Sequence, residues 1–371
     1  MRNINFIPTL LISLLLPILV FAQKEQKEQK ALKDLKWKAV STGMPKEWYG
    51  SDESKAVAES VLLYQRNSGG WPKSPPMHDP LTDAIRAKLK REKNNDTGST
   101  FDNSITTSQM IFLAKMYNKV PDPLYKDAFV KAVEYIFKAQ YPNGGWPQYY
   151  PLRKDYSRYI TYNDNAMFKI MDLLNDIIKH DPLYNFISSE ELINRAKIAF
   201  DKGIQCYLKT QFVINGKPTI WCAQHDEKTL APAGARSYEL PSLSGGESAG
   251  IIEQLMEIKD PSPEVISAVK SAIEWLEAHK VEGIMVENFV NSHGEGDRCA
   301  VKDEKAPTLW GRFYDLETQE VFMCDFDGKK IKSMNDLGWD RRHGYNWYAP
   351  SPQKVLDKYP EWKKSVKKSN K

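Results

Sequence analysis

The sequence predicts a mainly helical fold, in which pairs of helices form a toroid or bundle around one cleft. Two observations support this prediction. Trp71, Trp146 and Trp221 recur with an interval of 75 residues. A helical run precedes each tryptophan, and a second amphipathic run follows it after a loop. Helix pairs that bury one face against the next pair form a toroid or bundle, with the variable loops on one rim.

The first half of each repeat is a helix that ends at a glutamine before a tight turn. The three segments are SVLLYQRNSGGWPK, AVEYIFKAQYPNGGWPQYYP and IQCYLKTQFVINGKPTIWCAQ. Their glutamines are Gln65, Gln140 and Gln211. Gly, Asn and Pro residues between each glutamine and its tryptophan predict the turns.

The second half of each repeat is a helix that begins at an acidic residue. TFDNSITTSQMIFLAKMY, YNDNAMFKIMDLLNDIIKH and GGESAGIIEQLMEI carry apolar residues at helical spacing. A single acid at such a start is explained by helix capping. Three acids in register converge on one cleft of a toroid, where carboxylate and amide oxygens suit calcium. The acids and their polar neighbours are Asp102-Asn103, Asp164-Asn165 and Glu247-Ser248.

Beyond the third repeat, the sequence predicts one more helix and then short strands. Residues 261–280, PSPEVISAVKSAIEWLEAHK, are amphipathic, and TLWGRFYDLETQEVFMCDFDGKK alternates as a hairpin would, with Asp327-Gly328 as its turn. The chain ends in KKSVKKSNK. We therefore expect a catalytic domain at 41–352, preceded by a charged leader at 23–40 and followed by a solvated basic tail at 353–371.

The N-terminus has the features of a secretory signal. Arg2 precedes an apolar run at 6–21, and Val20-Phe21-Ala22 places small residues before Gln23. No other run approaches the roughly 18 apolar residues of a membrane span. We expect a signal peptide at 1–22 and a mature protein that is secreted or periplasmic, with no membrane insertion after cleavage.

Composition excludes some partners. The formal charge of the 371 residues is only +4, which argues against nucleic-acid binding. Local positive charge would still favour an acidic substrate. The four cysteines have no paired CxxC spacing, so one or two disulfides and free buried thiols both remain open. We expect a monomer.

Several cationic residues lie beside the repeated tryptophans or in the loops. Lys73 follows Trp71-Pro72, and Arg312 follows Trp310. Arg236 lies two residues before Tyr238 in the loop of the third repeat and has no counterpart in the other two. Such side chains bind carboxylates, arginine in bidentate fashion. The alternative for each is a surface ion pair.

Long motifs in the chain resemble one known family. NSGGWPK, TFDNSITTSQMIFLAKMY, QYPNGGWPQYYPLRKDYSRYITYNDNAM, TIWCAQHDEKTLAPAGARSYELPSLSGGESAGI and PTLWGRFYDL occur in order between about residues 40 and 350. Together they resemble the pectate lyases of polysaccharide lyase family 10. The resemblance implies an (α/α)3-type toroid, with irregular loops and short strands forming the cleft. It also implies calcium-dependent β-elimination of polygalacturonate, an acidic polysaccharide, and Ca²⁺ as the cofactor.

The same motif matching implies roles for individual residues. Arg236 is expected to be the catalytic base, although an arginine pKa above about 12 requires neighbouring cations to hold it partly neutral. Asp102 and Asp164 are expected to bind calcium. Lys73, Asn103, Arg312 and Tyr238 are expected to bind the substrate.

Two other functions stay open on the sequence alone. One is a glycoside hydrolase on a helical toroid, acting on a uronic-acid polysaccharide with two of Asp102, Asp164 and Glu247 as its acid and base. The other is a non-catalytic protein that binds uronates.

Overall fold

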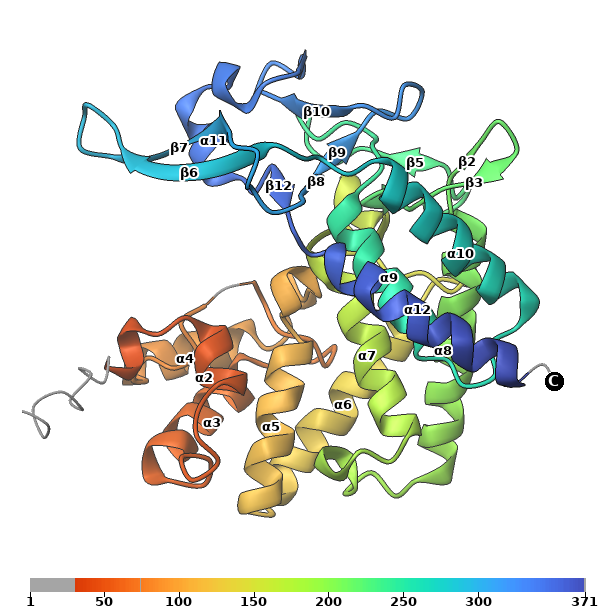
Figure 1. Ribbon diagram of the computed structural model, residues 1–371. Coiled ribbons are helices and arrows are strands. Elements are labelled where there is room, and N and C mark those ends of the chain that lie inside the picture. Colours follow the sequence, from red (N-terminus) through yellow and green to blue (C-terminus); the bar gives the residue numbers. More distant parts are fainter. Residues whose placement is uncertain (1–30, 74, 370–371) are drawn as a thin grey trace, which may run out of the picture.

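The repeats fold into two rows of helices in the computed structural model, which describes residues 31–73 and 75–369 (Figure 1). In the first row, each helix contacts the next, and the same is true of the second row. The first row consists of α3 (Asp52–Tyr64), α6 (Pro123–Ala139), α8 (Glu190–Thr210) and α10 (Pro263–Ala278). The second row consists of α5 (Thr107–Lys119), α7 (Ala166–Ile178) and α9 (Gly245–Met256).

Helices of the two rows also pack as the consecutive pairs α5/α6, α7/α8 and α9/α10. Their facing sides are apolar and join in one large core. Three such pairs in succession confirm the predicted mainly helical, (α/α)3-type class. Side-chain caps differ between the rows. Ser51, Asp122, Ser189 and Ser262 each accept a backbone N–H at the start of a first-row helix. The second-row helices have no such cap.

The repeated tryptophans and glutamines join the helices through buried hydrogen bonds. The indole N–H of each tryptophan donates to a carbonyl of the helix before it, and Trp310 does the same toward α10. The side-chain amide of Gln140 donates to Gly144 O at 3.0 Å and to Ala199 O of α8 at 2.8 Å. Gln65 and Gln211 make the equivalent pairs of bonds. The glutamine therefore connects its own turn to the next first-row helix.

A lobe of short strands lies above the helices (Figure 1). Its hairpin of β10 (Val321–Cys324) and β11 (Lys330–Ile331) turns through Gly328 at a φ of 78°, as the Asp327-Gly328 turn predicts. β9 (Phe313–Tyr314) completes this sheet, and β8 (Trp310–Gly311) pairs with β12 (Tyr348–Ala349). Helix α11 (Trp339–Gly344) lies between β11 and β12 in the chain. The longest strands, β6 (Ile284–Val290) and β7 (Gly296–Lys302), form a hairpin that the sequence analysis missed.

Smaller strands occur in the loops between the helices. β1 (Ile160–Thr161), β4 (Gln224–His225) and β5 (Pro232–Ala233) form one sheet beside the third repeat. β2 (Val213–Ile214) and β3 (Lys217–Pro218) form the turn after α8. On the opposite side of the molecule, α4 (Asp83–Glu92) packs on α3.

The prediction of a solvated basic tail at the C-terminus is wrong. Residues 353–369 form helix α12 (Gln353–Ser369), which contacts α9 and α10. Its buried side chains belong to the main core, and the lysines at 354, 358, 363, 364 and 367 are exposed on its outer face. The buried side chains are Val355, Leu356, Trp362 and Val366.

The described part of the leader is also packed. Helix α2 (Trp37–Thr42) contacts α5, and the indole N–H of Trp37 donates to Ser108 Oγ at 3.0 Å. Residues 1–22, where the signal peptide is expected, lie outside the described residues. Within residues 31–73 and 75–369, no helix is long and apolar enough to span a membrane. All four cysteines are free thiols, which decides between the two alternatives left by their spacing.

Candidate active site

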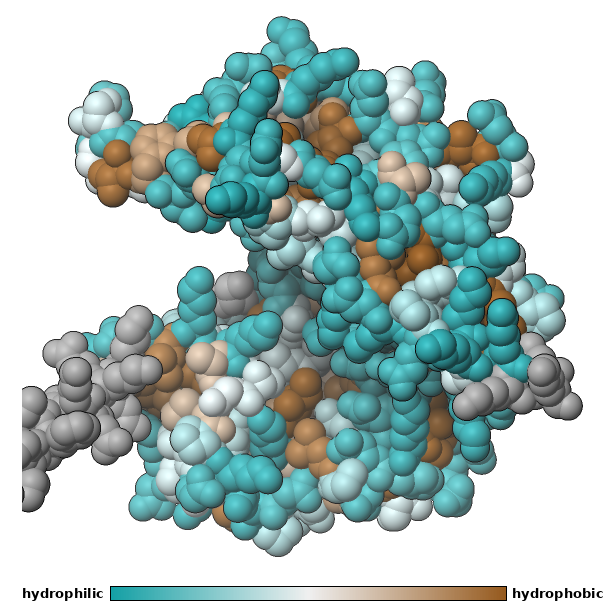
Figure 2. Space-filling model, in the orientation of Figure 1, coloured by the Kyte–Doolittle hydropathy of each residue, from teal (hydrophilic) through white to brown (hydrophobic). Residues whose placement is uncertain are grey.

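A hollow separates the strand lobe from the helices below it (Figure 2). Part of it is a cavity of about 510 Å³ that Asn165, Glu247, Arg312 and Asn346 line together with α12. The starts of α7 and α9 and the loop after Trp310 therefore open on the same space. This agrees with the expectation that loops of successive repeats converge on one cleft.

The acidic residues precede their helices in short, strained turns. Asn103 and Asp164 have φ values of 51° and 53° in the single turns of 3₁₀-helix before α5 and α7. Left-handed backbone in residues other than glycine costs roughly 1–3 kcal/mol and is concentrated at functional sites. Neither Asp102 nor Asp164 caps its helix, so the capping explanation does not hold for them.

The backbone changes the register in which the repeats correspond. Thr100, Thr161 and Ser244 each donate their N–H to the carbonyl of the repeated tryptophan. The third residue after each of these is Asn103, Asp164 or Glu247, so these three residues occupy equivalent positions in the repeats. The sequence alignment of Asp102 with Asp164 is therefore wrong by one position, because Asp102 lies two residues after its bonded threonine and Asp164 lies three after its own.

That offset gives Asp102 a different environment. Its side chain is buried and forms an ion pair with Lys73 Nζ. Partial burial lowers the pKa of Lys73, but the bond to Asp102 and the nearby Asp164 outweigh this, so its pKa is raised. Lys73 stays charged and compensates Asp102.

Asp164 lies where charges of both signs meet. Burial raises its pKa, and the charges of Asp102 and Glu247 raise it further, while Arg312 and Lys73 act in the opposite direction. The three predicted acids are thus close enough to interact, as the repeat predicts. Glu247 also bonds to the hydroxyl of Ser244, the residue that precedes α9.

Arg312 reaches across from the strand lobe. Its Nη2 donates to Asn163 Oδ1 at 3.2 Å, and its guanidinium lies 5.1 Å from the centre of the Tyr345 ring. The buried Nε of Arg312 has no hydrogen-bond partner among the described residues. This N–H of Arg312 can therefore still donate a hydrogen bond at the site.

Arg236 is held by a carboxylate and a phenol. Its Nε and Nη2 donate to Glu239 at 2.8 and 2.7 Å, and Nη2 also donates to the hydroxyl of Tyr345 at 2.8 Å. The Tyr345 hydroxyl in turn donates to Glu239. These bonds raise the pKa of Arg236 above its already high value, despite the opposing effect of partial burial. Tyr345 contacts both arginines, which places Arg236 beside Arg312.

Glu239 is ionised in this network. Burial raises its pKa, but the bonds from Arg236 and Tyr345 outweigh burial and leave the pKa below its ordinary value. Sequence reasoning missed both partners. Glu239 had a signal, since it lies three residues after Arg236 in ARSYELPS. Tyr345 had none, because it is 109 residues away in sequence.

The two remaining predicted residues lie at the edges of this site. The Tyr238 ring centre is 5.2 Å from the guanidinium of Arg236 and 4.6 Å from that of Arg341, so it supports both cations. Arg341 is fully buried and donates to Cys324 O. Asn103 is exposed and lines a separate, neighbouring cavity.

The histidines play no visible part here. Burial lowers the pKa of His225 to about 4, and its ring bonds to Leu230 O at 3.0 Å, so it is a neutral structural residue. His293 lies in the turn between β6 and β7.

The residues present suit a hard cation in part. Asp164 has the oxygen donors that calcium prefers and a crowded negative environment that a cation would relieve. Asp102 is already paired with Lys73. No group of three acidic, histidine or cysteine side chains is arranged to hold a metal ion within residues 31–73 and 75–369. Asp164 thus fits a site that other ligands must complete.

Comparison with known proteins agrees with this arrangement. The family described as pectic acid lyase matches residues 65–356. Two solved structures of a family 10 polysaccharide lyase from Cellvibrio cellulosa, one a variant in complex with trigalacturonic acid, are similar to the chain. Each has 30% identity and a TM-score of 0.73 over 88% of this chain, and 95% or 94% of the other chain is covered. No curated protein sequence matched.

The fold is that of a polysaccharide lyase. The chain belongs to the pectic acid lyase family, within polysaccharide lyase family 10. Lyase chemistry therefore takes precedence over the hydrolase and the non-catalytic binding protein as the function of this site.

Proposed function

We propose that this lyase is an exported enzyme that cleaves de-esterified polygalacturonate by calcium-dependent β-elimination and releases 4,5-unsaturated oligogalacturonides. Arg312 and Lys73 lie close enough to Asp164 to lower its pKa, and Tyr345 contacts both Arg312 and Arg236. This grouping of charges carries the proposal. Arginine and lysine bind uronate carboxylates, and the trigalacturonic acid bound to the Cellvibrio cellulosa variant supports this substrate class.

The reaction removes the proton on C5, beside the uronate carboxylate. Negative charge then develops on that carboxylate, where Arg312 and Lys73 would stabilise it. The C4–oxygen bond breaks, and its electrons leave with the glycosidic oxygen while a C4–C5 double bond forms. Because this step yields an unsaturated sugar and consumes no water, its product differs from that of hydrolysis.

Arg236 is the proposed base, oriented by Glu239 and Tyr345. A high pKa makes neutral arginine a strong base but makes that form scarce. Substrate binding that draws Glu239 away from Arg236 would favour proton transfer.

Calcium is the proposed cofactor, with Asp164 as its principal protein ligand and uronate oxygens completing the site. Bound calcium would add positive charge at the substrate carboxylate. Asp102 joins this ligand set only by exchanging Lys73 for the metal. Lys73 would then be released to bind a uronate.

One assay tests the reaction class. Polygalacturonate is incubated with the enzyme, with and without a chelator, and both reducing ends and the ultraviolet absorbance of the unsaturated product are followed. We expect both signals to rise together and the chelator to abolish them. Reducing ends without absorbance would mean hydrolysis. Full activity of Arg236→Ala would refute the proposed base, and a chelator-resistant rate would refute the calcium requirement.

A further inference from the structure

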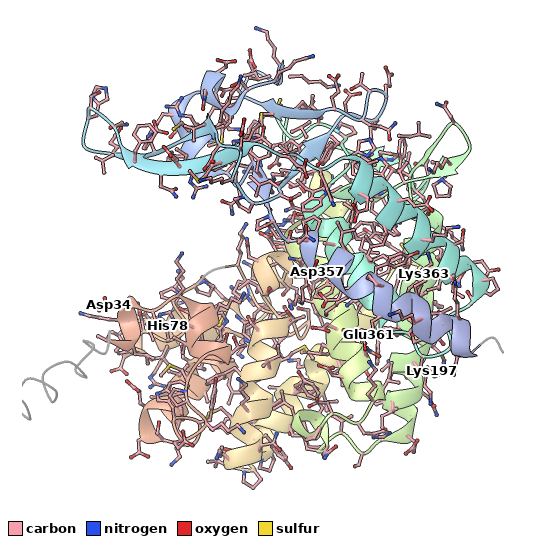
Figure 3. The ribbon with its side chains drawn as sticks, in the orientation of Figure 1. Asp34, His78, Lys197, Asp357, Glu361 and Lys363 are labelled. Carbon is pink, nitrogen blue, oxygen red and sulfur yellow. The ribbon has the colours of Figure 1, made fainter. Side chains whose placement is uncertain are left out.

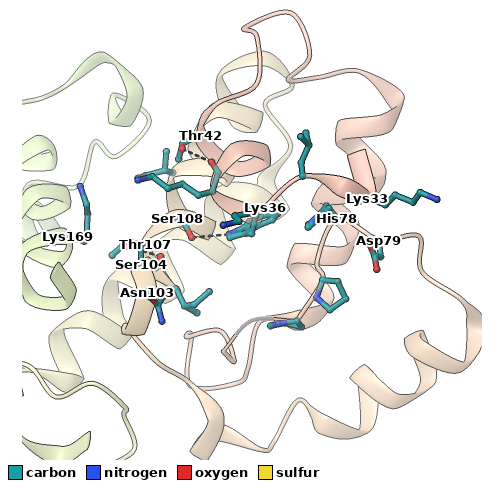
Figure 4. Close-up of a pocket in the computed structure, with 17 residues that line it drawn as sticks. Lys33, Lys36, Thr42, His78, Asp79, Asn103, Ser104, Thr107, Ser108 and Lys169 are labelled. Atoms are coloured by element: carbon teal, nitrogen blue, oxygen red, sulfur yellow. Dashed lines mark hydrogen bonds between the residues drawn. The ribbon is translucent and has the colours of Figure 1, made fainter. Parts of the chain in front are cut away.

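A second cavity lies directly beside the acidic turn before α5. Its volume is about 820 Å³. Asn103, Ser104 and Thr107 form one side of it, and residues 33–42 and 75–79 form much of the rest (Figure 4). Asn103 and Ser104 directly follow Asp102, so the cavity begins where the candidate active site ends.

The cavity is strongly cationic. Lys33, Lys36, Lys38 and Lys169 line it, against one carboxylate, that of Asp79. Within the described part of the chain, Lys33, Lys36 and Lys38 form no ion pair. Unpaired lysines gathered around a hollow leave a local positive potential, although the net charge of the chain is small.

An aromatic surface accompanies the charges. Trp37 is partly exposed in the cavity wall and stacks on His78, with ring centroids 6.2 Å apart. Its indole N–H is bonded to Ser108, which fixes the ring. A fixed aromatic ring beside cations suits a ligand that has both an apolar sugar face and carboxylates.

The cavity adjoins the one at the active site. Lys38 and Lys169 also line the cavity that contains Glu247 and Arg312. A bound chain could therefore pass from Arg312 across these two lysines to Trp37. The wall formed by residues 33–42 precedes the residues that the family model matches.

We propose that this cavity is a distal subsite that binds uronate units of an acidic polysaccharide beyond those at the reacting bond. This inference rests on the proposed function for the identity of the polymer. Long substrates engage Lys33 and Lys36, whereas a trimer occupies only the catalytic centre. The subsite therefore raises affinity for long chains without changing the chemistry.

The test is the double variant Lys33→Glu/Lys36→Glu, two lysines that line only the distal cavity, with Lys363→Glu/Lys364→Glu as the control. Both variants change the net charge equally at exposed positions. Lys363 lies on α12, on the far side of the molecule from His78 (Figure 3). Calorimetry with Arg236→Ala added to every protein measures the Kd of polygalacturonate and of trigalacturonate without turnover.

We expect Lys33→Glu/Lys36→Glu to weaken polygalacturonate binding at least tenfold, to leave trigalacturonate binding within twofold, and to leave kcat unchanged in proteins that retain Arg236. Equal polymer affinity in the variant and its parent would overturn the proposal, as would equal loss in the control or with the trimer. If the unmodified enzyme released no unsaturated product, the proposed function would fail, and the binding comparison would still decide whether the cavity holds the polymer.

Discussion

At the scale of single residues, the site is organised by which charge each group faces. Lys73, itself half-exposed, neutralises the buried carboxylate of Asp102, whereas Asp164 remains under the influence of two other acids. Arg236 and Arg312 meet at the ring of Tyr345. The carboxylate most available to a cation and the arginine proposed as base therefore belong to different halves of the cleft. A substrate placed between them would contact both.

Glu239→Gln tests how Arg236 is controlled. The change removes the charge that raises the pKa of Arg236. The rise of kcat with pH that reports deprotonation of Arg236 should therefore move to lower pH. Weaker orientation should also lower kcat at the optimum about tenfold, the effect of one charge-assisted bond. KM should change less than twofold. The exposed Glu361→Gln serves as control, and an unshifted profile in Glu239→Gln would contradict the role of Glu239.

Asp164→Asn tests the calcium site. Loss of the carboxylate should raise the calcium concentration needed for half-maximal activity at least tenfold, because amide oxygen is a weaker ligand for calcium than carboxylate. Since the pKa of Asp164 is raised, calcium binding to the parent should strengthen as pH rises through that pKa. Calorimetric calcium titration at several pH values measures both effects. Asp201→Asn on the outer face of α8 should behave like the parent; if Asp164→Asn does too, calcium binds elsewhere.

At the scale of elements, the repeat is held by polar bonds inside an apolar core. Each repeated glutamine bonds to its own turn and to the next helix of the first row. The turns approach those helices closely: a Cβ on Gly144 would lie 2.0 Å from Lys202 O, at a φ of 96° that also favours glycine. The Gln–turn–Trp motif is therefore a requirement of packing, and it sets where the catalytic loops begin.

Gln140→Leu should lower the free energy of unfolding by about 1–3 kcal/mol, because Gly144 O would lose its donor and Ala199 O would lose the donor that it has besides the helix. Urea denaturation followed by circular dichroism measures the change. Gln205→Leu, at an exposed position of α8, is the matched control and should change stability by less than about 0.5 kcal/mol. A similar small change for Gln140→Leu would show that the bridge contributes little.

At the scale of the whole molecule, the chain combines a repetitive helical scaffold with a strand lobe inserted before the last helix. Leu243 and Tyr314 exchange two backbone hydrogen bonds, and α12 returns from the lobe to pack on α9. The lobe supplies Arg312 and Tyr345, while the scaffold supplies the acids. The stability of this assembly depends on pH through groups remote from the cleft.

Asp176 on α7 is such a group. Burial first, and then Asp172 and Asp181, raise its pKa to about 6 from 3.8. The folded state therefore holds this proton more tightly than the unfolded state, so stability falls as pH rises from about 4 to about 6 and stays lower above. Asp176→Asn should be more stable than the parent at pH 8 by about 1 kcal/mol, allowing for solvent screening, and similar to it at pH 4.

Thermal unfolding at both pH values measures this, and the expected rise in Tm at pH 8 is roughly 1–2 °C. Asp201→Asn should show no comparable dependence on pH. An equal effect of Asp176→Asn at pH 4 and pH 8 would mean that ionisation of Asp176 is not the cause.

Local patterns in the sequence sufficed for the scaffold. The 75-residue interval, the glutamines and the helical periodicity identified both rows of helices, since these features arise from contacts repeated along the chain. The β6/β7 hairpin and helix α12 were not recognised. The basic face of α12 concealed four buried residues in a sequence that reads as a solvated tail.

The site depended more on tertiary structure. Sequence motifs named Arg236, Arg312, Lys73, Asp102 and Asp164, and their spatial grouping followed only from the folded chain. The one-residue offset between Asp102 and Asp164 arises from the path of the backbone before α5. The partnership of Arg236 with Tyr345 joins residues 109 positions apart. The sequence by itself determined the repeated helices, because they depend on periodic local burial; only the tertiary structure decided which charge faces which, because that depends on contacts between distant segments.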